Sequence, residues 1–106
     1  KSHRDFRLAN KLMPKGSGAI LSFGIKGGKK SAIKFINSLK VFSHLANIGD
    51  TRSLVIHPAS TTHAQLNKKD LHKSGVTEDL IRLSIGIEDL DDLLKDLTNG
   101  LKKAMK

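Results

Sequence analysis

The segment Leu80-Ile81-Arg82-Leu83-Ser84-Ile85 gives the clearest structural signal in the chain. Its side chains alternate in character, and one face of an extended segment would carry only Ile81, Leu83 and Ile85. The other face would carry Arg82 and Ser84 together with Leu80. A period of two residues is typical of a β-strand. We therefore predict a strand over residues 80–85, with its aliphatic face toward a hydrophobic core.

A helix is predicted directly after this strand, because apolar residues recur there at helical spacing. The predicted apolar stripe comprises Leu90, Leu93, Leu94, Leu97, Leu101 and Met105. The acidic residues near its start are Glu88, Asp89, Asp91 and Asp92, and the basic residues in its last turn are Lys102, Lys103 and Lys106. Both sets complement the helix dipole. We interpret the acidic cluster as part of the helix start, not as a metal site or an acid/base pair.

The remaining predicted elements are a helix over 1–13, strands over 19–25, 41–45 and 53–56, a helix over 29–39 and a short helix over 68–73. Pro14 should end the first helix. Asn67 is expected to cap the short helix, and Gly75 to close it. The order α, β, α, β, β, α, β, α indicates an α+β fold, in which helices cover one face of a small, mostly antiparallel sheet.

A chain of 106 residues is expected to form one domain, residues 1–106. It has no cysteine and no apolar run long enough to cross a membrane, and we expect a cytoplasmic protein without disulfides. The chain begins with Lys1 in place of methionine, and we expect it to be a piece of a longer protein.

The net charge of +9 is unevenly distributed along the chain. Residues 1–49 hold ten Lys and Arg against the single acid Asp5, whereas residues 50–106 hold nine of each. The excess indicates either solvated lysines or a basic patch that faces an acidic partner. Nucleic-acid binding is disfavoured, because the four phenylalanines do not interleave with the lysines as stacking platforms would.

Arg82 is the first candidate functional residue, because it lies mid-strand between Ile81 and Leu83. A guanidinium at such a position either binds a carboxylate or phosphate, or reaches a solvated sheet face. Ser53 follows a predicted turn, where a hydroxyl could orient a ligand or could simply mark the strand edge. His57 and His63 lack a third ligand nearby, so no metal site is predicted.

Four stretches, residues 12–23, 53–63, 75–76 and 80–89, together resemble the C-terminal domain of the cystathionine/methionine family of pyridoxal-phosphate enzymes. They are LMPKGSGAILSF, SLVIHPASTTH, GV and LIRLSIGIED, in the order the family has them. The resemblance implies the fold-type I transferase architecture. In it, a large domain binds pyridoxal phosphate (PLP) through a Schiff-base lysine, and the small C-terminal domain closes over the substrate.

The resemblance also implies roles for individual residues. The arginine that binds the substrate carboxylate falls on Arg82, and the serine that borders the site near the lysine falls on Ser53. Thr62 and Ser84 lie in matched motifs and are treated as supporting residues. No catalytic or cofactor-binding residue is expected in this chain, so the chain alone should be inactive.

Within the family, residues 47–54 and 61–66 look most like O-acetylhomoserine sulfhydrylases of methionine biosynthesis. Arg52 stands where enzymes acting on cystathionine often have glutamate. The implied partners are O-acetylhomoserine, the large PLP-binding domain of the same parent chain, and further copies in a homotetramer. The alternatives are cystathionine gamma-synthase, O-succinylhomoserine sulfhydrylase, methionine gamma-lyase, or a free-standing amino-acid-sensing module of a different class.

Overall fold

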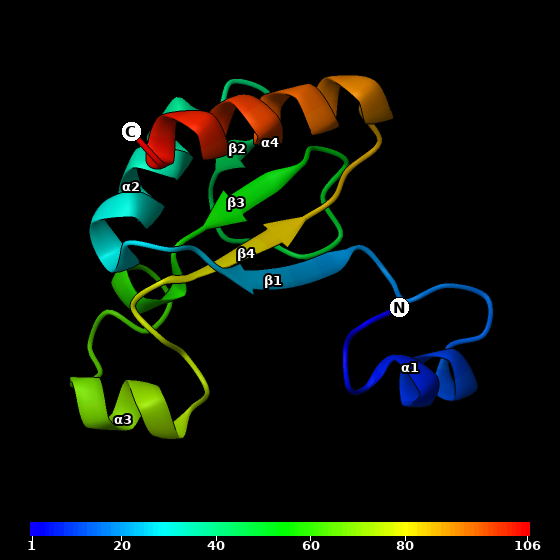
Figure 1. The fold of residues 1–106 in the computed structure, drawn as a ribbon, viewed down its shortest axis with the longest axis horizontal. Helices are drawn as coiled ribbons and strands as arrows, with labels where there is room; N and C mark the ends of the chain where they lie inside the picture. The colour runs from blue at the N-terminus through cyan, green and yellow to red at the C-terminus, as the bar shows by residue number, and fades with distance from the viewer.

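The computed structural model describes all 106 residues and has the predicted order of elements. The helices are α1 (Phe6–Leu12), α2 (Gly28–Ser38), α3 (Lys68–Lys73) and α4 (Leu90–Ala104), with a single 3₁₀ turn η1 (Pro58–Ser60). The strands are β1 (Ile20–Gly24), β2 (Ser43–His44), β3 (Leu54–Ile56) and β4 (Leu80–Ser84). The predicted α+β fold is confirmed (Figure 1).

The four strands form one mixed sheet in the order β1-β4-β3-β2. Strand β4 is antiparallel to both of its neighbours, and only the short pair β2 and β3 is parallel, so the predicted mostly antiparallel sheet is confirmed. The register places Arg82 of β4 between Ser22 of β1 and Ile56 of β3. Arg82 therefore lies on an inner strand whose backbone is paired on both sides.

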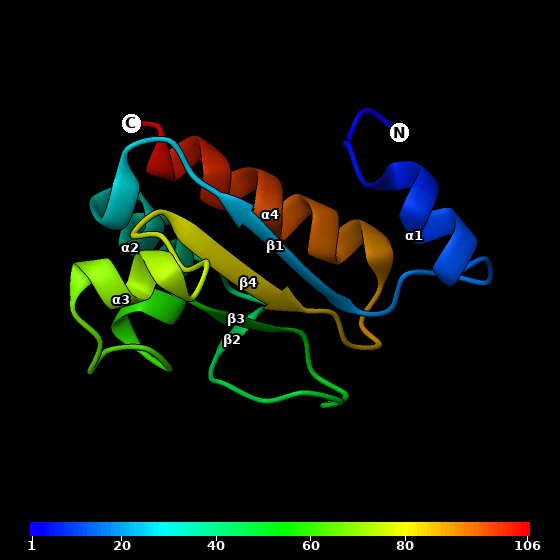
Figure 2. The same cartoon turned by 90° about the horizontal axis from the view of Figure 1, so that it is seen from below.

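Helices α2 and α4 pack against each other and cover the same side of the sheet (Figures 1 and 2). The core between the layers includes Ala32, Phe35 and Ile36 from α2, Val55, Ile81 and Leu83 from the sheet, and Leu93 and Ala104 from α4. The rings of Phe23 and Phe35 meet edge to face with their centroids 5.8 Å apart, an arrangement that aromatic pairs prefer. The predicted inward face of β4 is thus confirmed.

Only two of the six residues in the predicted apolar stripe of α4 contact the core. Leu93 is buried and Leu97 packs against the core, but Leu90, Leu94, Leu101 and Met105 are exposed. The inward positions are instead completed by Asp96, Gly100 and Ala104. A Cβ atom at Gly100 would lie 2.8 Å from Leu39 Cδ2 and 3.1 Å from the Phe35 ring. Small residues therefore face α2, because the two helices pack too closely there for leucine.

Asp96 is a buried acid on the inward face of α4. Its carboxylate accepts hydrogen bonds from the backbone N–H groups of Lys40 (2.9 and 3.1 Å), Val41 (2.8 Å) and Phe42 (3.3 Å). These bonds compensate the cost of burying the charge. They also explain why the predicted strand over 41–45 is reduced to Ser43–His44, since amides bonded to Asp96 are not free for a sheet ladder.

The helix ends follow the predicted chemistry in most places. Asn67 caps α3 by accepting from the Asp70 N–H at 2.9 Å, and Gly75 adopts a positive φ of 77° just beyond that helix. In α4, acidic residues occupy the first turn and lysines the last. Helix α1 is shorter than predicted, because residues 3–5 form a turn in which the Phe6 N–H donates to the His3 carbonyl at 3.0 Å.

Helix α1 stands apart from the rest of the chain in both views, at the end of the sheet opposite α3 (Figures 1 and 2). None of its residues is buried. No helix of the chain has the length and apolarity needed to span a membrane.

We predict that Asp96→Asn lowers the free energy of unfolding by about 2 kcal/mol, because an amide nitrogen cannot accept the bonds that the carboxylate oxygen accepted. Asp92→Asn is the matched control on the same helix. Asp92 is exposed, and its loss should cost less than about 1 kcal/mol, the size of a helix-dipole effect. Urea denaturation of both variants measures the difference, and equal losses would contradict the role given to Asp96.

Candidate functional site

Arg82 lies on the face of the sheet opposite α2 and α4, because Ile81 and Leu83 on either side of it point into the core. Its side chain is partly exposed and makes no hydrogen bond or ion pair with any residue of the chain. A guanidinium presents several N–H donors in a fixed plane that matches a carboxylate. The N–H donors of Arg82 are therefore free within this chain, and their plane suits two parallel N–H···O bonds to an anion.

Ser84 lies on the same face as Arg82, two residues further along β4, and it is buried. Thr62 lies in the exposed loop between η1 and α3, where its hydroxyl pairs with Nδ1 of His63 at 2.9 Å. No hydrogen bond links Thr62 to Arg82, Ser53 or Ser84. The structure thus brings Arg82 and Ser84 together on one face. The supporting roles of Ser84 and Thr62 stay predictions.

Ser53 is completely buried just before β3. Its N–H and its hydroxyl each donate to the Glu88 carboxylate at 2.7 Å, and its hydroxyl oxygen accepts from the Gly86 N–H at 2.8 Å. Its carbonyl accepts from the Ser43 N–H at 2.9 Å. We call the bonds among Ser53, Gly86 and Glu88 the Ser53 junction. Because every polar group of Ser53 is satisfied within the chain, its direct contact with a substrate stays a prediction.

The sequence pattern places Glu88 among the acids at the start of α4, and this prediction is wrong. Asp89 caps that helix, accepting from the N–H groups of Asp91 (2.9 Å) and Asp92 (3.3 Å), while the Glu88 carboxylate bonds to Ser53. The backbone and side-chain hydrogen bonds from Ser53 hold the pKa of Glu88 below its usual value. The carboxylate therefore stays ionised at neutral pH. Local sequence offered no signal for this contact, since the partners are 35 residues apart.

Arg52, directly before Ser53, is held by Asp50. Two hydrogen bonds join its guanidinium to the Asp50 carboxylate, from Nε at 3.1 Å and from Nη2 at 3.0 Å. These bonds, with a third from the Arg52 N–H, lower the pKa of Asp50 to about 2. Arg52 is still exposed to solvent, so a cation is fixed in place at the start of β3.

The two histidines considered as metal ligands have separate local partners. His57 is buried, with Nδ1 2.7 Å from Ser60 Oγ and Nε2 2.7 Å from the Glu78 carbonyl oxygen. Both of its ring nitrogens are thus occupied. No group of three or more His, Asp or Glu side chains is placed to hold a metal ion.

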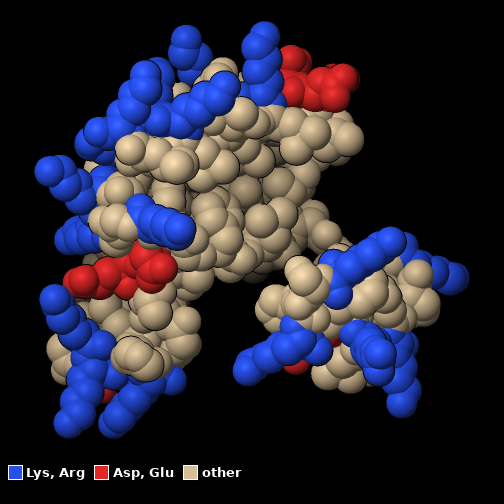
Figure 3. Space-filling view, viewed as in Figure 1, with Lys and Arg blue, Asp and Glu red and all other residues tan.

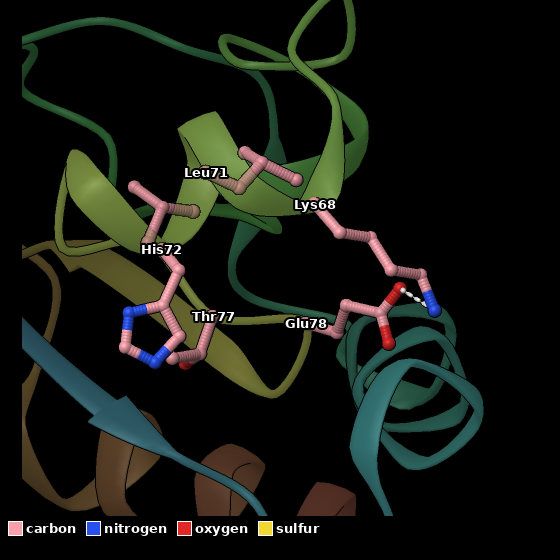
Figure 4. Close-up of a pocket in the computed structure, with 6 residues that line it drawn as sticks. Lys68, Leu71, His72, Thr77 and Glu78 are labelled. Atoms are coloured by element: carbon pink, nitrogen blue, oxygen red, sulfur yellow. Dashed lines mark ion pairs between the residues drawn. The ribbon is translucent and has the colours of Figure 1, made fainter.

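A cavity of about 210 Å³ opens between α3 and the segment that leads into β4 (Figure 4). Its floor is apolar, formed by Leu71 and Val76, and at its rim Lys68 and Glu78 point toward each other as an ion pair at 3.4 Å. None of the predicted site residues lines it. This cavity is therefore separate from the Arg82 face.

Basic side chains cover α1, α3 and the side of the molecule where α2 and the end of α4 lie (Figure 3). Only Phe6 of α1 lies among them, because Phe35 and Phe42 are buried and Phe23 packs on the core. Every lysine of the chain is exposed. A Schiff-base lysine is enclosed by the site around it, whereas every lysine of this chain, including Lys68 at the rim of the cavity, is open to solvent, so the lysines present here do not fit PLP.

Comparison with known proteins gives consistent matches. A family model described as Cys/Met metabolism PLP-dependent enzyme matches residues 1–102. The chain is 54% identical over 90 residues to an O-acetyl-L-homoserine sulfhydrylase from Corynebacterium glutamicum, a match that covers 85% of this chain and 21% of that protein.

Two solved structures share the fold. Cystathionine gamma-lyase from yeast superposes with a TM-score of 0.90 at 39% identity, covering 100% of this chain and 27% of the other. A Campylobacter jejuni structure that carries N′-pyridoxyl-lysine-5′-monophosphate gives a TM-score of 0.86 at 40% identity, covering 95% of this chain and 24% of the other.

The chain spans about a quarter of the length of these relatives. The match of the family model extends over nearly all of this chain, and the fold agrees with that of the family's solved members. The chain therefore belongs to the Cys/Met metabolism family of PLP-dependent enzymes.

Proposed function

We propose that this chain is the substrate-carboxylate-binding C-terminal domain of a PLP-dependent enzyme. The proposed reaction converts O-acetylhomoserine and sulfide or a thiol into homocysteine or methionine, with release of acetate. The observation that carries this proposal is the position of Arg82, a guanidinium without any partner in the chain, on the sheet face opposite α2 and α4. Such a group suits the α-carboxylate of an amino acid.

Arg82 would bind the α-carboxylate through two parallel N–H···O bonds and so fix the orientation of the substrate. Pairing of β4 on both sides holds the Arg82 backbone, which limits how far the bound carboxylate can shift. Orientation of this kind supplies part of a rate acceleration, because a held substrate needs less rearrangement to react. The cofactor, bound outside this chain, supplies the electron sink for the chemistry.

The support for O-acetylhomoserine as the substrate comes from Arg52 and from the similarity to sulfhydrylases. A cation held by Asp50 stands where enzymes acting on cystathionine often have glutamate. The distal end of cystathionine is a zwitterion whose ammonium a glutamate could bind, and Arg52 offers no acceptor for that ammonium, whereas the acetyl end of O-acetylhomoserine is uncharged and needs no ionic partner. The relative at 54% identity is an O-acetyl-L-homoserine sulfhydrylase.

A second candidate function is a cystathionine enzyme of the same family, favoured by the TM-score of 0.90 to yeast cystathionine gamma-lyase. Arg82 would hold the same carboxylate in that case, so the two candidates differ only in the rest of the substrate. The homotetramer and the cytoplasmic location stay predictions.

We predict that Arg82→Ala in the full-length parent enzyme lowers kcat/KM for O-acetylhomoserine about 100-fold, because loss of a charged two-point contact costs about 2–3 kcal/mol. Arg82→Lys should recover only part of this loss, since an ammonium cannot form the planar pair. Arg7→Ala, at an exposed position of α1, is the control and should match the wild type. An unchanged kcat/KM in Arg82→Ala would refute the proposed role.

The substrate is tested by assaying the parent enzyme with O-acetylhomoserine, O-succinylhomoserine and cystathionine in parallel. We expect the highest kcat/KM with O-acetylhomoserine, and we expect Arg52→Glu to shift the preference toward cystathionine by supplying a carboxylate for its distal ammonium. A preference of the wild type for cystathionine would overturn the proposed substrate and leave the family assignment intact.

The isolated 106-residue chain is expected to form only weak Schiff bases spread over several lysines when PLP is added, because exposed amines react with the aldehyde but no site holds one adduct. Absorbance spectroscopy before and after borohydride reduction measures this. Reduction that fixes the cofactor to one specific lysine would show that the chain holds a cofactor site of its own.

A further inference from the structure

We propose that Glu88 is a positioning residue for Arg82 and acts through the Ser53 junction. The inference rests on the proposed function of Arg82. It concerns a carboxylate that does not touch the substrate but holds the strand that carries the substrate-binding arginine.

The Ser53 junction joins the start of β3 to the end of β4. The Glu88 carboxylate accepts both the N–H and the O–H of Ser53 at 2.7 Å, and Ser53 Oγ accepts the Gly86 N–H at 2.8 Å. A neighbouring backbone bond, from the Ile87 N–H to the Thr51 carbonyl at 2.9 Å, crosses the same gap. Four hydrogen bonds thus connect residues 51–53 with residues 86–88.

Gly86 allows these two segments to approach. A Cβ atom there would overlap the Thr51 carbonyl oxygen and would lie 2.6 Å from the Ser53 nitrogen. Those neighbours are backbone atoms, which cannot move aside as a flexible side chain would. The absence of a Cβ atom at Gly86 therefore allows the two segments to pack closely, and this close packing holds the Glu88 carboxylate against Ser53.

Arg82 depends on this connection through the pairing of β3 with β4. Strand β3 has only three residues, and its pairs with β4 run from Leu54 opposite Ser84 to Ile56 opposite Arg82. So short a ladder has few bonds of its own to define its register. The five pairs with β1 hold the face of β4, so a slip by one residue would reverse the faces of β3 and remove Ile56 from its place beside Arg82. The Ser53 junction fixes the register at one end, and Arg82 lies at the other.

The charge of Glu88 is needed for this role. Both of its oxygens accept from Ser53, and these bonds lower the pKa of the carboxylate, so it is an acceptor at neutral pH. Glu88→Gln keeps the size of the side chain but places an NH₂ donor against one of the two Ser53 donors. The variant tests the hydrogen bonds without creating a large cavity.

The test compares Glu88→Gln with Asp91→Asn in the full-length holoenzyme. Asp91 is an exposed acid in the first turn of α4 and serves as the matched control. We expect Glu88→Gln to raise KM for O-acetylhomoserine about tenfold, which corresponds to about 1.4 kcal/mol, and to change kcat less than about twofold. Asp91→Asn should leave both at the wild-type value.

A double-mutant cycle separates positioning from a general effect on stability. In the Arg82→Ala background, Glu88→Gln should change KM less than about twofold, because no arginine remains to be positioned. The inference would be overturned if Glu88→Gln raised KM tenfold both with and without Arg82. It would also be overturned if the single variant Glu88→Gln had the wild-type KM. Should Glu88→Gln fail to fold, Ser53→Ala replaces it in the cycle. That variant should raise KM about threefold, only where Arg82 is present.

The two proposals fail in different ways. If Arg82→Ala itself leaves KM unchanged, the proposed function of Arg82 is wrong and the positioning role with it. If Arg82→Ala raises KM but Glu88→Gln shows no coupling to it, only the positioning role is wrong. The same cycle applies with whichever substrate the enzyme prefers, since each carries an α-carboxylate.

Discussion

The buried carboxylate of Asp96 organises the connections on which the Arg82 face depends. By accepting the N–H groups of residues 40–42, it fixes the segment between α2 and β2 against α4. The next residue, Ser43, donates to the Ser53 carbonyl, and Ser53 in turn bonds to Gly86 and Glu88. Glu88 leads directly into α4. A series of hydrogen bonds therefore connects Asp96 of α4 with the end of β4, and the chain then returns from Glu88 into α4.

Local periodicity predicted the order of the elements and the inward face of β4, because alternation and helical spacing are properties of neighbouring residues. It failed for α4, where Gly100 and Ala104 face α2 and leucines face solvent. The reason is the tight contact of the two helices, which depends on residues about 65 positions earlier in the chain and leaves no mark on the α4 pattern itself.

In the candidate site, too, the sequence predicted what depends on neighbouring residues and missed what depends on distant ones. Arg82 is a candidate from the sequence because a charged residue in an apolar strand is a local anomaly, and its place on the sheet face opposite α2 and α4 follows from alternation. Glu88 was misassigned because it stands beside a run of acids that does serve a helix start. Its partner Ser53 lies 35 residues away, and only the folded chain brings the two together. Ser53 forms its hydrogen bonds within the chain, and its contact with a substrate stays a prediction.

Arg52 lies just before β3 and Arg82 lies in the middle of β4, and their surroundings give the two side chains different roles. The Arg52 guanidinium is already satisfied by Asp50, so a carboxylate ligand would have to displace an ion pair before binding there. Arg82 has no such partner, and because it is partly exposed, water satisfies it at little cost until a ligand arrives. The full attraction of a guanidinium for a carboxylate is therefore free at Arg82 and already used at Arg52, which suits the role proposed for Arg82. The value of that attraction depends on a backbone that does not shift when the ligand binds, which the pairing of β4 on both sides provides.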